Sequence, residues 1–253
     1  MSFKVVIPAR YASTRLPAKA VLEIAGRPML QWVIRAAEKS QAEQVLVATD
    51  DQRVADVALS TAGHNVAVMT RSDHQSGTDR IAEVATHHGW DERTIVVNVQ
   101  GDEPQLPPAL IDQVASLLAQ HPGADIATLC TPIMSLHEFL DPNVVKVVTA
   151  RGTDALYFSR APIPWHRDGA GQGLSSQTSI LGSQRHLGIY AYRVGALKKL
   201  TSLPPSDLEV IEKLEQLRAL QAGMRIVVGV AAEAPGIGVD TPQDLERVRA
   251  QMS

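Results

Sequence analysis

Short apolar runs rich in β-branched residues recur along this chain, and each is followed by a polar turn and then by a stretch with helical periodicity. This alternation is typical of successive βα units. The run 94–99 is almost wholly apolar, as expected of a parallel strand that helices cover on both faces. The sequence therefore predicts an α/β fold with a doubly wound, mostly parallel (mixed) sheet. The predicted strands are 3–7, 44–49, 65–70, 94–99, 124–130, 144–149, 186–193 and 224–231, and the predicted helices are 28–39, 51–62, 79–88, 108–120, 208–221 and 242–252.

Prolines and glycines mark several helix boundaries. Pro28 and Pro242 stand where a first helical residue is expected, a position that tolerates the missing amide hydrogen. Gly63, Gly89 and Gly223 stand at the ends of predicted helices, where a left-handed backbone conformation stops a helix.

The second half of the chain departs from this rhythm. Residues 144–193 hold predicted strands with no helix between them, and 168–177 is rich in Gly, Ser and Gln, which favours a mobile loop or hairpin. The last strand and helix resume the earlier pattern, and no linker divides the chain. We therefore expect a single domain over 1–253 with a small β-rich insertion at about 155–195.

The composition excludes several classes of protein. Lys and Arg total 24 against 27 Asp and Glu, a formal net charge of −3, and only 4% of residues are aromatic, so we expect no nucleic-acid partner. The single cysteine, Cys130, excludes an intramolecular disulfide and a Cys-rich metal site. The apolar stretch near the N-terminus is too short for a signal peptide and no segment has the length of a membrane span, so we expect a cytoplasmic protein without membrane insertion.

The loop after the first predicted strand carries the strongest chemical signal. Arg10, Arg15 and Lys19 lie within ten residues, with no acidic residue among them. Ligands of open α/β sheets gather beyond the carboxyl ends of the strands, where cations can neutralise phosphoryl oxygens. The loop therefore favours a polyphosphate site, and a merely solvated basic loop is the alternative. It has neither a Walker A pattern nor a dinucleotide-binding turn, which argues against a P-loop hydrolase and a Rossmann dehydrogenase.

Two aspartates are candidate ligands for a magnesium ion. Asp102 follows the apolar run 94–99, after a glycine that lets the backbone approach a ligand, and Asp240 lies on a distant loop before Pro242. Carboxylates at such positions suit a magnesium ion that bridges phosphate groups. The alternative role for Asp240 is an N-terminal cap of the last helix.

Further polar segments lie at predicted strand and helix ends. The segment 71–80 runs into a helix, where backbone amides and hydroxyls can hold polar ligand edges or simply cap the helix. Glu212 and Glu215 are three residues apart on the predicted helix 208–221, a spacing that usually indicates only a charged helix face.

Taken together, these segments resemble the 3-deoxy-manno-octulosonate (Kdo) cytidylyltransferases, also called CMP-Kdo synthetases. Each motif alone is weak, but seven in the same order along almost the whole chain are specific. The motifs are Pro8-Ala9-Arg10 with Ser13, Arg15-Leu16-Pro17 and Lys19; Ser76-Gly77-Thr78-Asp79-Arg80; Gln100-Gly101-Asp102-Glu103-Pro104; Tyr157-Phe158-Ser159-Arg160; His186-Leu187-Gly188-Ile189-Tyr190; Leu214-Glu215-Gln216-Leu217-Arg218; and Gly238-Val239-Asp240-Thr241.

The resemblance implies a nucleotidyltransferase with a glycosyltransferase-A-like α/β fold that works as a homodimer. It implies conversion of CTP and Kdo to CMP-Kdo and pyrophosphate with Mg²⁺, an activation step for lipopolysaccharide synthesis. The insertion at about 155–195 would bind sugar and supply dimer contacts. The implied residues are, for catalysis, Arg10, Lys19, Asp102 and Asp240; for magnesium, Asp102 and Asp240; for CTP, Pro8, Ala9, Arg10, Arg15, Lys19, Arg71, Ser76, Gly77, Asp79, Arg80 and Gln100; and for the sugar, Gln100, Arg160, His186, Tyr190, Glu212, Glu215 and Gln216.

Two other interpretations stay open. The sugar could be a related acid such as 8-amino-Kdo, which these motifs do not separate from Kdo, whereas sialate activators share the opening motifs but not the segment 100–104. A non-catalytic nucleotide-sensing module on the same fold would bind CTP without releasing pyrophosphate.

Overall fold

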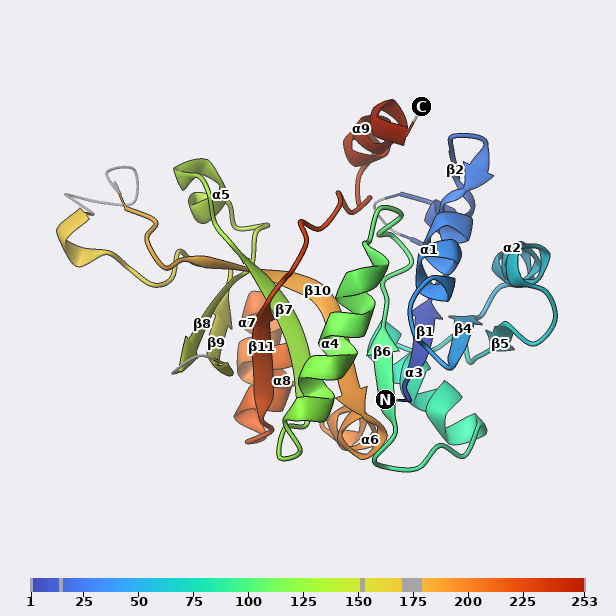
Figure 1. The fold of residues 1–253 in the computed structure, drawn as a ribbon, viewed down its shortest axis with the longest axis horizontal. Coiled ribbons are helices and arrows are strands. Elements are labelled where there is room, and N and C mark those ends of the chain that lie inside the picture. Colours follow the sequence, from blue (N-terminus) through green and yellow to red (C-terminus); the bar gives the residue numbers. More distant parts are fainter. Residues whose placement is uncertain (1, 14–15, 151–152, 170–178, 253) are drawn as a thin grey trace.

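The structure is a computed structural model that describes residues 2–13, 16–150, 153–169 and 179–252. A nine-stranded sheet forms its centre, in the order β5-β4-β1-β6-β10-β7-β11-β9-β8 (Figure 1). Its strands are β1 (Lys4–Pro8), β4 (Gln44–Thr49), β5 (Ala67–Met69), β6 (Ile95–Asn98), β7 (Ile126–Pro132), β8 (Lys146–Ala150), β9 (Asp154–Ser159), β10 (Gln184–Arg193) and β11 (Ile226–Val230). A separate small hairpin pairs β2 (Glu23–Ile24) with β3 (Arg27–Pro28).

The sheet is mixed, as predicted, but parallel pairing is confined to the strands β5, β4, β1 and β6 and to the pair β7–β11. β1 lies parallel to β4 and β6, and β5 lies parallel to β4. β10 is antiparallel to both β6 and β7, and β11 returns parallel to β7. The pairs β8–β9 and β9–β11 are antiparallel. The expectation of a mostly parallel sheet is therefore wrong beyond β6, because β8, β9 and β10 follow one another without the crossover helices that parallel pairing needs.

Helices cover both faces of the sheet. Side chains alternate along β1, so that Val5 and Ile7 pack with α1, α2 and α4, whereas Val6 packs with α3, α6 and α8. The helices are α1 (Met29–Glu38), α2 (Gln52–Ala62), α3 (Gly77–His87), α4 (Pro108–Gln120), α5 (Leu136–Leu140), α6 (Val194–Ser202), α7 (Asp207–Glu212), α8 (Gln216–Gln221) and α9 (Pro242–Met252), with short 3₁₀ turns η1 (Lys19–Val21) and η2 (Arg167–Gly169).

Several predicted boundaries need correction. The predicted helix 208–221 is two helices, because Lys213 has a left-handed backbone (φ 54°) that ends α7 before α8 begins. β5 starts later than predicted, because Asn65 also has a positive φ of 68°. Pro28 precedes the first residue of α1 rather than being that residue, whereas Pro242 does begin α9. The short hairpin β2–β3, the strand β9 and the helices α5 and α6 were not predicted from the sequence.

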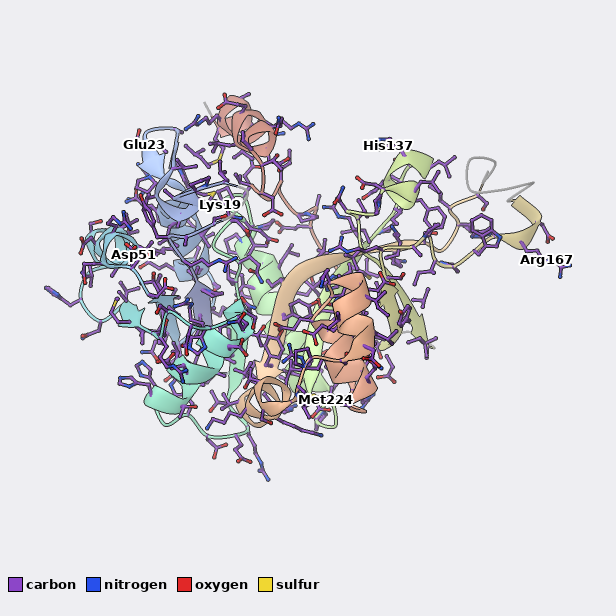
Figure 2. The ribbon with its side chains drawn as sticks, turned by 180° about the vertical axis from the view of Figure 1, so that it is seen from behind. Lys19, Glu23, Asp51, His137, Arg167 and Met224 are labelled. Atoms are coloured by element: carbon purple, nitrogen blue, oxygen red, sulfur yellow. The ribbon has the colours of Figure 1, made fainter. Side chains whose placement is uncertain are left out.

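An arm extends from the sheet between β9 and β10 (Figure 1). Seen from behind, Arg167 in η2 lies at the far end of this arm, well away from Lys19 (Figure 2). The predicted mobile segment 168–177 falls almost entirely outside the described residues. Among the helices that the structure describes, none has both the length and the apolarity needed to cross a membrane.

Candidate functional site

Three loops meet at Pro8, where β1 ends. A Cβ added to Gly101 would lie 3.1 Å from the Pro8 carbonyl oxygen, and one added to Gly77 would lie 3.1 Å from the Pro8 ring. These contacts explain why glycine occupies both positions, since a side chain would push the loops apart. The loop after β1, the loop after β6 and the start of α3 are thereby held together.

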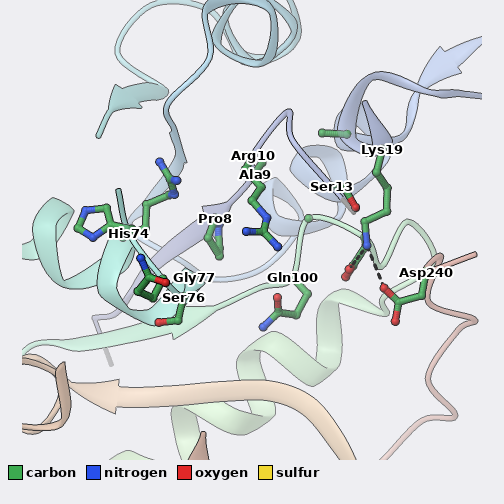
Figure 3. A pocket seen from close by; sticks show the side chains of 15 residues that line it. Pro8, Ala9, Arg10, Ser13, Lys19, His74, Ser76, Gly77, Gln100 and Asp240 are labelled. Carbon is green, nitrogen blue, oxygen red and sulfur yellow. Dashed lines mark hydrogen bonds and ion pairs between the residues drawn. The ribbon is translucent and has the colours of Figure 1, made fainter. Parts of the chain in front are cut away.

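Lys19 joins the two predicted metal ligands. Its Nζ donates to Asp102 Oδ2 at 2.6 Å and to Asp240 Oδ1 at 3.0 Å (Figure 3). The lysine side chain is 16% exposed, so these are partly buried ion pairs. The structure therefore brings together Lys19, Asp102 and Asp240, which lie far apart in the sequence.

The C-terminal segment is fixed so that Asp240 points to Lys19. The Val239 amide donates to the Asp102 carbonyl at 2.8 Å, which ties the two loops together. Thr241 and Asp244 share reciprocal hydrogen bonds at the start of α9, with the Thr241 amide 2.9 Å from Asp244 Oδ2. Thr241, not Asp240, caps the last helix, which removes the alternative role that the sequence left open for Asp240.

A first cavity of about 350 Å³ opens beside this cluster. Figure 3 shows Lys19 and Asp240 at one end, His74, Ser76 and Gly77 at the other, and Arg10 and Gln100 between them. The lining residues are Pro8, Ala9, Arg10, Ser13, Lys19, Ala20, His74, Gln75, Ser76, Gly77, Arg80, Gln100, Gly101, Asp102 and Asp240.

Two predicted CTP-binding residues have other partners in the structure. Arg71 is exposed and pairs with Asp73, with its Nε 3.0 Å from Oδ1. Asp79 accepts from the Ser76 amide at 3.0 Å in the capping box of α3. Neither lines the first cavity. Arg15 lies outside the described residues. The roles of these three residues in CTP binding stay predictions.

Arg80 is nearly buried, with 4% of its side chain exposed. Its Nη2 lies 3.0 Å from Asp50 Oδ2, and its Nη1 donates to Thr70 Oγ1. Burial of a guanidinium is tolerated when such partners satisfy its donors. Arg80 is thus a fixed cation in the wall of the first cavity.

A second cavity of about 190 Å³ adjoins the first through Gly77 and Gln100, which line both. Four of the predicted sugar-binding residues line it: Gln100, Tyr190, Glu215 and Gln216. Because Lys213 ends α7, the start of α8 lies beside this cavity. Thr78, which also lines the cavity, donates from its Oγ1 to Glu215 Oε1. Burial raises the pKa of Glu215, although hydrogen bonds from Thr78 and Ser76 oppose that shift. Glu215 is therefore a cavity residue and not part of a charged helix face.

His186 lines a third cavity, of about 240 Å³, with Asp102, Glu103 and Asp240. Burial, and then the charge of Arg185, lowers the pKa of His186 to about 3, so the ring is neutral near pH 7. Its Nε2 is 3.0 Å from Thr128 Oγ1. Burial, and then the Asp102 carboxylate, raises the pKa of Glu103 to about 7.

Arg160 and Glu212 form a separate cluster. Glu212 accepts from Ser159 Oγ at 2.6 Å and from the Arg160 amide at 2.9 Å. Arg160 Nε donates to the Glu212 carbonyl at 2.7 Å, and its Nη1 donates to the Pro142 carbonyl at 2.9 Å. These two residues line none of the three cavities described above. Their roles in sugar binding stay predictions.

Sequence reasoning assigned no role to several residues that line the cavities. His74, which pairs with Glu83, and Gln75 lie in the polar segment 71–80, and Glu103 lies in a motif whose aspartate was assigned instead. Asn98 and Tyr192 line the second cavity but looked like ordinary strand residues. Only the polar asparagine inside an apolar run could have signalled a buried binding group.

Comparison with known proteins identifies the family. The family model for "Cytidylyltransferase" matches residues 4–226. A "3-deoxy-manno-octulosonate cytidylyltransferase" of Thioalkalivibrio sulfidiphilus is 54% identical over 98% of both chains. The chain belongs to the 3-deoxy-manno-octulosonate cytidylyltransferase family. The resemblance predicted from the seven motifs is thereby confirmed.

Other relatives and solved structures extend the match. A cytidylyltransferase of the same name from Alcanivorax borkumensis is 52% identical and covers 100% of this chain and 99% of its own. A structure titled as a CMP:2-keto-3-deoxy-manno-octonic acid synthetase complexed with CTP has a TM-score of 0.87 at 43% identity, over 99% of this chain and 98% of its own. A 4-diphosphocytidyl-2C-methyl-D-erythritol synthase, with a TM-score of 0.65 at 14% identity over 100% of both chains, shares the fold alone. This cytidylyltransferase therefore has a nucleotidyltransferase fold.

The carboxylates of this cytidylyltransferase fit a divalent cation. Asp102 and Asp240 both lie within 3.0 Å of one lysine nitrogen, so two carboxylate oxygens from different loops already converge on a single positive charge. Among the described residues, no group of three or more His, Cys, Asp or Glu side chains could hold a metal by itself. Two carboxylates suit magnesium, which commonly completes its shell with substrate phosphates and water.

Proposed function

We propose that this protein transfers the cytidylyl group of CTP to Kdo, giving CMP-Kdo and pyrophosphate. The observation that carries the proposal is the convergence of Lys19 with Asp102 and Asp240 at one end of a cavity that also holds Arg10. The family match and the adjoining polar cavity support it. A cytoplasmic location and the supply of activated sugar for lipopolysaccharide synthesis are parts of this proposal that rest on the family resemblance.

The reaction needs positioning and charge neutralisation rather than a covalent enzyme intermediate. The anomeric 2-hydroxyl of Kdo attacks the α-phosphorus of CTP in line; the new oxygen–phosphorus bond forms as the bond to the leaving pyrophosphate oxygen breaks, and the hydroxyl proton is released. Arg10 and Lys19, which line the first cavity, would bind the triphosphate and offset charge on the departing pyrophosphate. Holding both substrates in line removes much of the entropic barrier.

Asp102 and Asp240 would hold Mg²⁺, with phosphate oxygens as further ligands. When bound, the ion would neutralise phosphate charge and increase the acidity of the attacking hydroxyl. Lys19 now occupies the place between the two carboxylates, and its ammonium would then turn to the triphosphate.

The sugar would lie toward the second cavity. Gln100 lines both cavities, so it can contact the nucleotide and the sugar. Tyr190, Glu215 and Gln216 offer hydroxyl, carboxylate and amide groups that suit a polyhydroxylated ligand. His186, with its neutral ring, would approach the sugar from the third cavity.

A pyrophosphate-release assay with purified protein, CTP and Mg²⁺ tests the proposal. We expect release with Kdo, and little release with sialic acid or without sugar. Release with 8-amino-Kdo in preference to Kdo would favour the alternative sugar. CTP binding without release for any acidic sugar would instead support a nucleotide-sensing module.

We also infer a homodimer built on the arm, within one domain whose insertion spans about 155–195. Large apolar side chains are exposed on the arm and just after β7: Leu181 is 80% and Trp165 45% exposed on the arm, and Met134 is 82% exposed after β7. The Ile133 amide donates to the Ser183 carbonyl at 3.0 Å, which brings the segments that carry Met134 and Leu181 together. Apolar surface gathered in this way favours burial against a second copy.

Leu181→Glu is expected to convert the dimer to monomer at micromolar concentration, because a buried carboxylate in an apolar interface would lack a partner. Sedimentation velocity measures this directly. Met69→Glu serves as the matched control, since Met69 is 52% exposed on β5 at the opposite edge of the sheet. A monomeric wild-type protein, or a Leu181→Glu variant that stays dimeric, would contradict the inferred interface.

A further inference from the structure

One buried amide in the second cavity has a polar atom without a partner. Asn98 lies on β6 opposite Tyr190 of β10 and is 2% exposed. Its Oδ1 has no hydrogen-bond partner among the described residues. Buried polar groups in folded proteins are nearly always paired, so an unpaired amide oxygen in a cavity wall calls for a ligand or an ordered water.

The neighbouring side chains explain why this oxygen is left over. Thr78 Oγ1 donates its one hydrogen to Glu215 Oε1, so it has none to offer the amide oxygen of Asn98. Tyr192 lies beside both Thr78 and Asn98, and burial raises the pKa of Tyr192, so its hydroxyl keeps its proton. No donor among the described residues is hydrogen-bonded to Asn98 Oδ1.

The cavity has room for more than a single water. Its volume of about 190 Å³ corresponds to roughly six water molecules at about 30 Å³ each. It shares the lining residues Gly77 and Gln100 with the first cavity, so a substrate bound there lies next to it. An acceptor at this place pairs with a hydroxyl group, whereas a carboxylate or an ether oxygen brings no hydrogen to it.

We propose that Asn98 is a sugar-specificity residue, whose Oδ1 accepts a hydrogen bond from one hydroxyl group of the acidic sugar. This inference rests on the proposed function and deepens it. Asn98 lines the second cavity together with Tyr190, Glu215 and Gln216, so its amide lies where the proposed sugar would bind. A sugar that lacks the matching hydroxyl leaves the oxygen unpaired and is rejected.

The first test compares Asn98→Leu with wild type by steady-state kinetics. Leucine has a similar size but no hydrogen-bonding group, so the KM for Kdo should rise about ten-fold while the KM for CTP stays within about two-fold. Asn98→Ser is the second variant. The serine hydroxyl is too short to reach the position of the amide oxygen, and this polar variant should fold even if Asn98→Leu does not. We expect the same direction for both.

Thr49→Val is the matched control. Thr49 is also a fully buried polar residue, but it lies on β4 and lines none of the three cavities. The KM for Kdo should not change in this variant. An equal rise there would mean that loss of any buried polar group loosens the enzyme, and would overturn the role of Asn98.

A panel of singly deoxygenated Kdo analogues supplies the decisive measurement. With wild type, removal of one particular hydroxyl group should lower kcat/KM about ten-fold relative to Kdo. With the Asn98→Leu variant, removal of the same hydroxyl group should lower kcat/KM hardly at all. Equal losses at every position in both proteins would show that Asn98 holds only water, and would overturn the inference. Failure of the proposed function is seen separately, as wild-type protein that releases no pyrophosphate with Kdo.

Discussion

Asp102→Asn is expected to lower turnover by about 10³-fold while the protein stays folded. Asparagine has nearly the same shape, so the loop after β6 and its hydrogen bond from the Val239 amide should persist. What is lost is the negative charge that faces Lys19 at 2.6 Å and that would hold the magnesium ion. The measurement is pyrophosphate release at saturating CTP and Kdo over a range of Mg²⁺ concentrations. Near-normal turnover at saturating Mg²⁺ would remove Asp102 from the metal site.

Asp240→Asn should act in the same direction, because its carboxylate converges on the same charge from another loop. The double variant should lose much less than the product of the two single losses, since both residues act through one ion. Asp154→Asn is the control. It removes a carboxylate that pairs with Arg225 at 2.7 Å on the surface, and such pairs contribute little. Turnover of the control should equal that of wild type.

The fold could be predicted where local pattern and tertiary packing agree. The units β1 to α4 are regular, and Gly63, Gly89 and Gly223 all have the positive φ that their positions predicted. Between β8 and α8, where long-range pairing decides, the strands β8 and β10 were predicted but β9 and α6 were missed. β9 is amphipathic and short, and it becomes a strand because β8 and β11 flank it. Lys213 ends α7 in a conformation that its side chain does not encode.

The site was predictable at its charged residues and less so at its neutral ones. Loops at the carboxyl ends of β1 and β6 had to converge, so Arg10, Lys19 and Asp102 could be named from topology. Asp240 was a candidate ligand from its loop position, but its approach to Asp102 depends on the docking of a distant segment on that loop, which the sequence does not show. Tyr192 gave no signal, and Asn98 was at most an unexplained polar residue in an apolar run, because a side chain inside a strand reveals neither its cavity nor its partners.

Lys19→Ala is expected to lower kcat/KM for CTP by at least about 10²-fold while leaving the KM for Kdo nearly unchanged. Removing the ammonium takes away a cation from the loop after β1 and leaves Asp102 and Asp240 facing each other without it. The constants for CTP should change more than those for Kdo, because Lys19 lines the first cavity and not the second.

Lys19→Arg retains the charge and should recover part of the loss, although a planar guanidinium cannot reproduce a point charge between two carboxylates. Lys4→Ala is the control, since Lys4 pairs with Glu43 at 2.8 Å away from the cavities and its loss should change neither constant. If Lys19→Ala kept wild-type kcat and KM for CTP, or if it raised the KM for Kdo as strongly as that for CTP, the assignment of Lys19 to the triphosphate would be wrong.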